Sequence, residues 1–109
     1  MTIDVCPLEE LPPGSMRLVT AGELEIGVYN CGDGVLRAIE DRCSHDDGPL
    51  CEGDWEPDDC VVVCPRHGSR FDLASGRPLS LPAFVPVAVF EVRVEDGIVR
   101  LDLGTVAPS

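Results

Sequence analysis

The amino-acid sequence predicts a small all-β fold, and three observations support this prediction. Short apolar runs rich in β-branched residues recur along the chain, turn residues separate them, and two tight-turn signals lie between adjacent runs. The chain has 109 residues, of which 44% are hydrophobic and 26% are charged, as in an ordinary globular protein. This length allows one domain, so we expect residues 1–109 to fold as a single unit.

Six strands are expected from the apolar runs. They cover residues 16–20, 24–30, 35–40, 60–63, 86–94 and 98–103. The sequences Gly32-Asp33-Gly34 and Asp96-Gly97 suit the positive φ angles of tight turns, which predicts two antiparallel hairpins. Near the N-terminus, residues 7–11 are expected to form one helical turn before Pro12 and Pro13 end it.

The charge of the chain narrows the classes of partner. Twenty acidic residues oppose eight basic ones, all of them arginine, and the net charge is −12. Such a surface repels nucleic acid and anionic lipid, so we expect neither as a partner, whereas a basic protein would be attracted. The acidity also fits a role in solubility alone. No apolar run is long enough to cross a membrane, and residues 1–10 lack the pattern of a signal peptide, so a cytoplasmic protein is expected.

Two short motifs pair a cysteine with a histidine. They are Cys43-Ser44-His45 and Cys64-Pro65-Arg66-His67-Gly68, separated by residues 46–63, and they contain the only two histidines of the chain. Thiolates and imidazoles together favour zinc or an iron–sulfur cluster over magnesium or calcium. A zinc finger usually presents its ligands as like pairs, whereas both pairs here are mixed.

Mixed pairs suit a centre with two metal ions. Two loops can clamp a flat cluster from both sides, with both cysteines on one iron and both histidines on the other, which is the Rieske arrangement. We therefore predict that Cys43, His45, Cys64 and His67 bind one [2Fe–2S] cluster. A zinc site, and a metal-free pair of buried thiols with two satisfied histidines, remain the alternatives.

The sequence resembles the Rieske-type ferredoxins of bacterial systems that hydroxylate aromatic rings. The resemblance covers nearly the whole chain and rests on Cys43-Ser44-His45, on residues 64–72, on Ser75-Gly76 and on Leu81-Pro82-Ala83. It implies a Rieske fold of three antiparallel sheets resembling an incomplete barrel. A cluster-binding subdomain of two loops, about residues 41–83, would be inserted in it, with a third loop near Pro82 screening the cluster.

The resemblance also implies a function. The chain would be a monomeric one-electron carrier, not an enzyme, that passes electrons from a flavin-dependent reductase to a terminal ring-hydroxylating oxygenase. Two alternatives are the small Rieske subunit of an assimilatory nitrite reductase and an accessory Rieske-like protein of iron–sulfur cluster assembly.

The same resemblance indicates a low reduction potential. High-potential Rieske proteins carry a disulfide across the two loops, and Gly48 and Arg66 occupy the matching positions here. Ser69 keeps a hydroxyl expected to donate to a bridging sulfide, whereas Phe71 replaces a tyrosine that donates to a ligand sulfur. We expect a potential near the low end of the Rieske range, about −150 mV.

The remaining features have structural or electrostatic interpretations. Trp55 is expected to anchor its loop, and Cys6, Cys31, Cys51 and Cys60 are expected to be small buried hydrophobic residues, with a Cys51–Cys60 disulfide only in an exported protein. The acids between His45 and Cys60 form either an acidic collar beside the cluster or an ordinary solvated loop. Arg66 and Arg70 either contact a partner or pair with those acids. The acids are Asp46, Asp47, Glu52, Asp54, Glu56, Asp58 and Asp59.

Overall fold

The computed structural model describes residues 2–42, 50–51, 53–65, 68–79 and 86–103. This part of the chain contains nine β-strands and one 3₁₀ turn. They are β1 (Thr2–Pro7), η1 (Leu8–Glu10), β2 (Met16–Ala21), β3 (Leu24–Gly32), β4 (Val35–Glu40), β5 (Trp55–Glu56), β6 (Val61–Val63), β7 (Arg70–Asp72), β8 (Val89–Glu95) and β9 (Ile98–Asp102).

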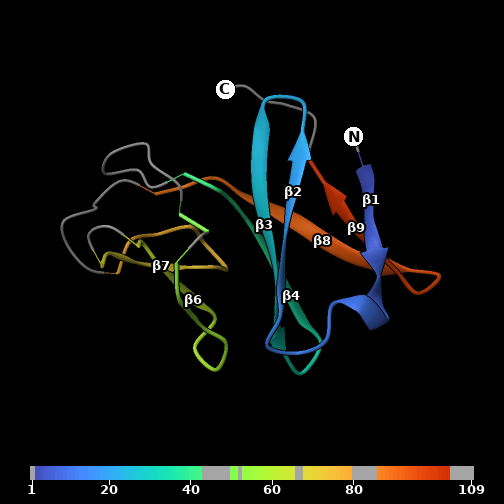
Figure 1. The fold of residues 1–109 in the computed structure, drawn as a ribbon, viewed down its shortest axis with the longest axis horizontal. Coiled ribbons are helices and arrows are strands. Elements are labelled where there is room, and N and C mark those ends of the chain that lie inside the picture. Colours follow the sequence, from blue (N-terminus) through green and yellow to red (C-terminus); the bar gives the residue numbers. More distant parts are fainter. Residues whose placement is uncertain (1, 43–49, 52, 66–67, 80–85, 104–109) are drawn as a thin grey trace.

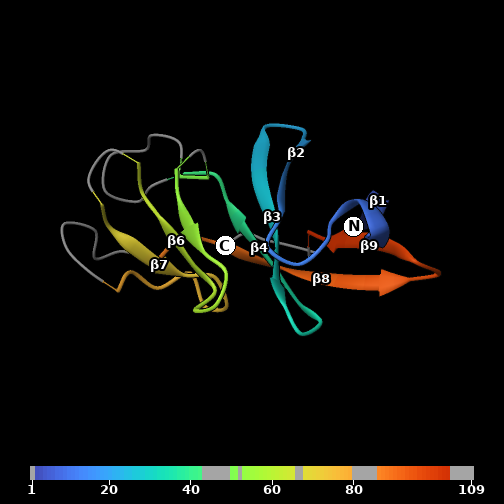
Figure 2. The same cartoon turned by 60° about the horizontal axis from the view of Figure 1, so that its bottom comes forward.

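The strands form a six-stranded sheet and a three-stranded sheet, all antiparallel. The order in the large sheet is β1-β9-β8-β4-β3-β2, and the order in the small sheet is β5-β6-β7. Strand β8 pairs with β4 only through Phe90 and Val89 and then continues along β9, so that two sets of three strands are joined there. The small sheet and the β8–β9 turn lie at opposite ends of the molecule in both views (Figures 1 and 2). The expected all-β fold with three sets of strands is confirmed.

Sequence periodicity located the longer strands and missed the short ones. All six expected strands are present, although the fifth begins at Val89 instead of residue 86. Asp33 and Asp96 have φ angles of 55°, as the two predicted hairpins require, and η1 confirms the predicted helical turn. The strands β1, β5 and β7 were not expected. Strands β5 and β7 have two and three residues, too few to show a period of two, and the pairing of β1 shifts register between Asp4 and Cys6.

Two hydrophobic cores lie on opposite faces of the central strands. In β3, Ile26 and Val28 pack in the core of the large sheet, whereas Tyr29 packs in the core beneath the small sheet. Strand β8 divides in the same way, with Val89 facing the small-sheet core and Phe90 facing the other. Both faces of these strands are therefore covered by apolar side chains. This explains why the alternation of apolar and polar residues is blurred at the start of β8.

A disulfide joins the two sheets, and it corrects one prediction. Cys31 near the end of β3 bonds to Cys60, which precedes β6, and the two positions are 29 residues apart. The interpretation of Cys31 and Cys60 as small buried hydrophobic residues was wrong, and so was a Cys51–Cys60 pair, because Cys51 is a free buried thiol. Cys6 is also free and buried, as expected. The spacing of cysteines cannot reveal a bond between separate sheets.

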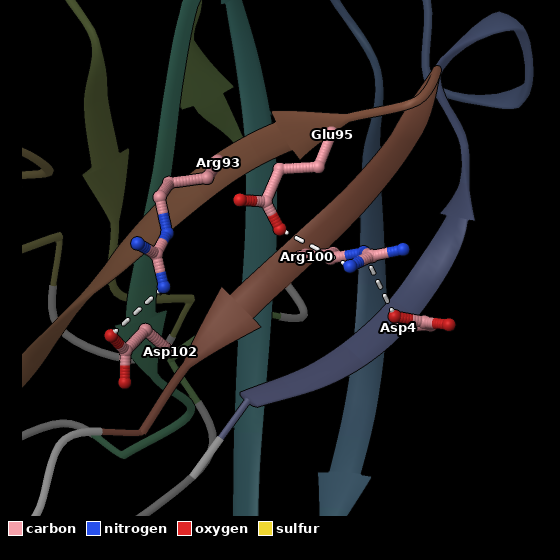
Figure 3. Close-up of polar contacts among 5 residues, drawn as sticks. All are labelled: Asp4, Arg93, Glu95, Arg100 and Asp102. Atoms are coloured by element: carbon pink, nitrogen blue, oxygen red, sulfur yellow. Dashed lines mark hydrogen bonds and ion pairs between the residues drawn. The ribbon is translucent and has the colours of Figure 1, made fainter.

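Exposed ion pairs connect the outer strands at the other end of the molecule (Figure 3). Arg100 Nε of β9 lies 3.2 Å from Asp4 Oδ1 of β1, and Arg100 Nη1 lies 3.2 Å from Glu95 Oε1 of β8. Arg93 Nη2 lies 3.3 Å from Asp102 Oδ2. Because the pairs are largely solvated, each contributes only about 0–1 kcal/mol to stability. They favour the observed register of β1, β9 and β8.

Candidate metal centre

Only one of the four predicted ligands lies in the described part of the chain. Cys64 is described, whereas Cys43, His45 and His67 lie outside the described residues. Among the residues that are described, no three histidine, cysteine or acidic side chains come together as a metal site. The structure therefore shows the segments that flank the predicted ligands.

Cys64 and Gly68, the first and last residues of the second Cys–His motif, lie between β6 and β7. The N–H of Cys64 donates to the carbonyl of Ser69 at 2.8 Å, and the N–H of Gly68 donates to the carbonyl of Cys64 at 3.0 Å. Gly68 has a φ of 74°, a conformation that glycine adopts without steric cost. The free thiol side chain of Cys64 is buried, with 1% of the residue exposed. The turn thus holds a soft donor out of water at its first position.

The first Cys–His motif lies between two segments that meet at one carboxylate. Asp41 follows β4, and its N–H donates to the carbonyl of Glu25 at 2.7 Å. Its Oδ1 accepts hydrogen bonds from the N–H groups of Leu50 at 2.8 Å and Cys51 at 2.6 Å. Leu50 and Cys51 are both buried in the small-sheet core. The chain therefore leaves the large sheet and returns to the core at the same point, with Cys43 and His45 between.

The segments that flank the two motifs also pack against each other. A Cβ atom at Gly53 would lie 2.7 Å from the carbonyl oxygen of Val63 and 2.9 Å from Cβ of Pro65, so only glycine allows this approach. The N–H of Val63 donates to the carbonyl of Asp54 at 2.9 Å. The residues after the first motif thus lie directly against the residues around Cys64.

Both flanks of the predicted third loop are fixed to the same lobe. The N–H of Leu79 donates to the carbonyl of Arg70 in β7, and the N–H of Val87 donates to the carbonyl of Gly76 at 2.8 Å. Pro82 itself lies outside the described residues. In the structure, the flanks of all three predicted loops belong to the part of the molecule that holds the small sheet (Figure 1).

Cys51 is a free thiol in this lobe, and its surroundings separate it from the predicted ligands. Burial raises the pKa of Cys51 to about 12, so it remains protonated at neutral pH. Burial also raises the pKa of its neighbour Tyr29 well above the usual value. A metal ligand must be a thiolate, and the geometry gives Cys51 a packing role over Gly27, where a Cβ would lie 2.6 Å from Cys51 Sγ.

Three further expectations can be compared with the described residues. Trp55 packs edge-on against Tyr29, with ring centroids 4.7 Å apart, which confirms its role as an anchor. Phe71 is fully buried in the small-sheet core and brings no hydroxyl. Arg70 forms an ion pair with Glu56, which is one of the two roles considered for it. Arg66 lies outside the described residues.

The described acids do not form one collar around Cys64. Asp54 is exposed. It lies near Cys64, because its carbonyl accepts a hydrogen bond from the N–H of Val63, the residue before Cys64. Asp58 and Asp59 are also exposed, but they precede β6 whereas Cys64 follows it, so they lie at the other end of the small sheet. Asp46, Asp47 and Glu52 lie outside the described residues, so the described acids place negative charge at both ends of the small sheet.

The donor chemistry of the predicted site fits a [2Fe–2S] cluster. Two thiols and two imidazoles are the ligand set of a Rieske centre. On the described side, a buried thiol begins a tight turn, and Gly68 leaves the backbone of that turn without a side chain. This environment favours a polarizable inorganic group over a hydrated ion such as magnesium.

A hollow on the large sheet offers no comparable chemistry. It has a volume of about 400 Å³ and is mainly apolar. Its amide group is already used, because Asn30 donates to the carbonyl of Leu11 and accepts from the N–H of Gly32. Its lining residues are Leu8, Glu9, Leu11, Pro12, Pro13, Asn30, Gly34, Leu36 and Val94. We assign it no catalytic role.

Comparisons with known proteins identify the family of the chain. A family model described as Rieske [2Fe-2S] domain matches residues 1–91. The chain is 40% identical to "Ferredoxin CarAc" of Metapseudomonas resinovorans over 96 residues, which covers 87% of both chains. It is 38% identical to the "3-phenylpropionate/cinnamic acid dioxygenase ferredoxin subunit" of Escherichia coli strain K12 over 106 residues, or 97% of both chains.

A solved structure gives the same result at the level of the fold. Its title is "Complex of reduced oxygenase and oxidized ferredoxin in carbazole 1,9a-dioxygenase". One chain of that complex is 39% identical to this chain, with a TM-score of 0.83, and the match covers 92% of this chain and 91% of the other. In the described residues of the present chain, no helix is long and apolar enough to span a membrane.

Proposed function

The chain belongs to the Rieske [2Fe-2S] domain family, and from this we propose that Cys43, His45, Cys64 and His67 hold the cluster of a one-electron carrier. The observation that supports this assignment best is the β6–β7 turn, which buries the free thiol of Cys64 at its first position. The bound [2Fe–2S] cluster supplies a couple that gains and loses a single electron. Residues 41–83 carry these ligands as one subdomain within the single domain.

Described residues of the chain keep water away from the Cys64 thiol and hold the flanks of the two motifs together. Cys64 and Ser69 are buried, and Asp41 and Gly53 hold the flanks of the two motifs together. Fixed flanks lower the reorganisation needed when the charge of the centre changes by one unit. In the Rieske arrangement, each histidine leaves one ring nitrogen for contact with a partner protein.

The protein is a ferredoxin component of an oxygenase system and not a catalytic enzyme. Its relatives are named as ferredoxins of aromatic dioxygenase systems, and one is solved in complex with its oxygenase. The partners are therefore a flavin-dependent reductase, which donates electrons, and a terminal ring-hydroxylating oxygenase, which accepts them. The names of these relatives do not point to nitrite reductase or to cluster assembly. The cytoplasm is the proposed compartment because the relatives are dioxygenase components, and the free thiols of Cys6 and Cys51 agree with a reducing compartment. The Cys31–Cys60 bond would be open to reduction there.

Metal analysis and electron paramagnetic resonance test the ligand assignment. The purified protein should contain two irons and two sulfides per chain, and its reduced form should give the rhombic signal of a mixed ligand set. Replacing Cys43, His45, Cys64 or His67 by alanine should abolish that signal. The matched controls Cys51→Ala and Cys6→Ala replace buried free thiols and should retain it. A single zinc ion in the wild-type protein, or loss of iron from the controls alone, would contradict the assignment.

A further inference from the structure

Cys31 and Cys60 form a site that the electron-carrier function does not use. Their Cα atoms are 5.4 Å apart, within the range in which two cysteines bond without a shift of the backbone. The bond lies away from Cys64, because Cys60 precedes β6 and Cys64 follows it. An inference about it is therefore independent of which residues bind the cluster.

The bond continues a row of contacts along one face of β3. Gly27, Tyr29 and Cys31 all face the small-sheet core, with Cys31 at the point where the pairing with β4 shifts register. Gly27 lies against Cys51, Tyr29 against Trp55, and Cys31 is bonded to Cys60. The three partners follow one another along the small-sheet lobe. The first two contacts are van der Waals contacts, so the disulfide is the covalent end of this attachment.

The disulfide is more accessible than the other described cysteines. Cys31 and Cys60 are partly exposed, whereas the free thiols of Cys6, Cys51 and Cys64 are buried. Thiol–disulfide exchange requires that a thiolate reach one of the bonded sulfur atoms. Their partial exposure therefore allows an external thiolate to reach the Cys31–Cys60 bond in the folded protein.

The backbone at Cys60 depends on its surroundings. Its φ is 55°, in the left-handed region that residues with a Cβ seldom adopt. Two hydrogen bonds hold it there, from the N–H of Cys60 to the carbonyl of Pro57 and from the N–H of Leu73 to the carbonyl of Cys60. Once the disulfide opens, only these bonds and local packing oppose relaxation of the turn, so the attachment of β5 and β6 weakens.

We propose that Cys31 and Cys60 are a reversible dithiol–disulfide site whose redox state sets how firmly the small-sheet lobe is attached to β3. The reductant is a protein dithiol. One of its thiolates attacks a sulfur of the pair, forms a mixed disulfide and releases the other cysteine as a thiolate, which takes up a proton. The second thiol of the reductant then resolves the mixed disulfide. Two electrons and two protons pass to Cys31 and Cys60, and the reductant leaves as a disulfide.

Thiol counting on the intact holoprotein tests whether the site exists. The protein is treated under native conditions with a reduced protein dithiol or with dithiothreitol, quenched in denaturant with a maleimide, and mapped by mass spectrometry. Before treatment, Cys31 and Cys60 should be unlabelled while the free cysteines are labelled. After treatment, both should be labelled. Free thiols at both positions in protein purified in air, or a bond that resists reduction until the protein unfolds, would overturn the proposal.

Stability and hydrogen exchange test what the site does. Reduction should lower the midpoint of thermal unfolding by roughly 10 °C, as expected for opening a loop of this length. The amides of Val61–Val63 should exchange about tenfold faster, while those of Ile98–Asp102 should not change. Equal exchange of Val61–Val63 in the two states would contradict a role in lobe attachment.

Two variants provide matched controls. The double variant Cys31→Ser/Cys60→Ser should behave like the reduced protein and should not respond to dithiol, whereas Cys6→Ser should respond as the wild type does. If the double variant does not fold, the oxidised and reduced wild-type proteins give the same comparison without a mutation. A Cys6→Ser protein that no longer responds would also contradict the assignment, because Cys6 lies in the core of the large sheet.

Discussion

At the scale of single residues, Asp41 connects the two flanks of the first Cys–His motif. One oxygen of its carboxylate accepts the N–H groups of both Leu50 and Cys51, which belong to the buried core of the lobe. Hydrogen bonds to a charged acceptor are among the stronger ones in proteins, and a buried N–H left without a partner is costly. The side chain therefore sets where the motif leaves and rejoins the fold.

Two substitutions at Asp41 distinguish the contribution of its charge to stability from that of its hydrogen bonds. Asp41→Ala should lower the free energy of unfolding by about 2–3 kcal/mol, because two N–H groups lose their acceptor. Asp41→Asn keeps an acceptor oxygen and should lose about half as much. Chemical denaturation measures both, and Asp54→Ala is the control, since it removes an exposed acid near the same site. Equal destabilisation by the Asn and Ala variants would show that charge, and not hydrogen bonding, is what Asp41 contributes.

Cys51 should make the protein less stable at high pH. Its pKa is about 12 in the folded state against 9.0 for an ordinary thiol, so the folded protein keeps this proton longer than the unfolded chain does. This contribution is complete below about pH 9 and is lost as the pH rises toward 12, by up to about 1.4 kcal/mol per pH unit. Between pH 8 and 11, the free energy of unfolding measured in urea should decline less steeply for Cys51→Ala than for the wild type. An identical slope in both proteins would disprove the prediction.

Substitution of Ser69 tests whether a single hydroxyl influences the reduction potential. Its side chain is buried, and it directly precedes β7. Hydrogen bonds to the sulfurs of a cluster raise its potential, so Ser69→Ala should have a more negative potential than the wild type. Protein-film voltammetry measures both values, and we expect a reduction potential of about −150 mV for the wild type. A wild-type potential well above zero, or no change on substitution, would be inconsistent with this view.

At the scale of elements, Gly76 joins β7 to the chain that enters β8. Its φ is 76°, and a Cβ there would lie 1.9 Å from the carbonyl oxygen of Val87. At the same place, the N–H of Val87 donates a hydrogen bond to the carbonyl of Gly76. The approach fixes both flanks of the predicted third loop, and it is possible only because position 76 has no side chain.

Gly76→Ala should therefore be far more destabilising than a glycine substitution in open space. We expect a loss of about 2–4 kcal/mol, from the left-handed backbone together with the steric contact. The matched control is Gly22→Ala, whose φ is 63° but whose Cβ would meet nothing within 4 Å, and about 1 kcal/mol is expected there. Thermal unfolding of the two variants decides the matter, and equal losses would rule out the steric component.

At the scale of the whole molecule, the net charge of −12 exceeds what any local group of acids explains. Exposed acids lie at both ends of the small sheet, as Asp54 and Asp59 show, and the described ion pairs use only a few of them. A field of this kind acts over the distance of a Debye length and speeds the approach of a basic partner more than it tightens the final complex.

Electron transfer to a basic partner should therefore depend on salt. Its bimolecular rate constant should fall severalfold as the Debye length shrinks from about 30 Å at 0.01 M salt to about 3 Å at 1 M. Stopped-flow reduction of the purified oxygenase measures the rate constant. Asp58→Asn/Asp59→Asn should reduce the rate at low salt and have little effect at high salt. A rate constant that does not change with salt would assign the acidity to solubility alone.

The sequence by itself determined the all-β class, the two hairpins and the paired Cys–His motifs. Each of these depends on local features, such as turn residues with positive φ, runs of β-branched side chains and donor atoms a few residues apart. The short strands β5 and β7 could not be recognised, since two or three residues carry no periodicity. Asp41, an acid at the start of the first irregular stretch, was a signal in the sequence that the prediction of the site did not include.

Only the tertiary structure decided how the motifs are held and what joins the two sheets. The Cys31–Cys60 bond, the bonds to Asp41 and the close approach at Gly53 and Gly76 all connect segments that are distant in the sequence. Such contacts depend on the position of β3 between two cores, which follows from the packing of the whole chain. Local preferences select turns and strands, whereas the pairing of distant segments is decided by which apolar faces can be buried together.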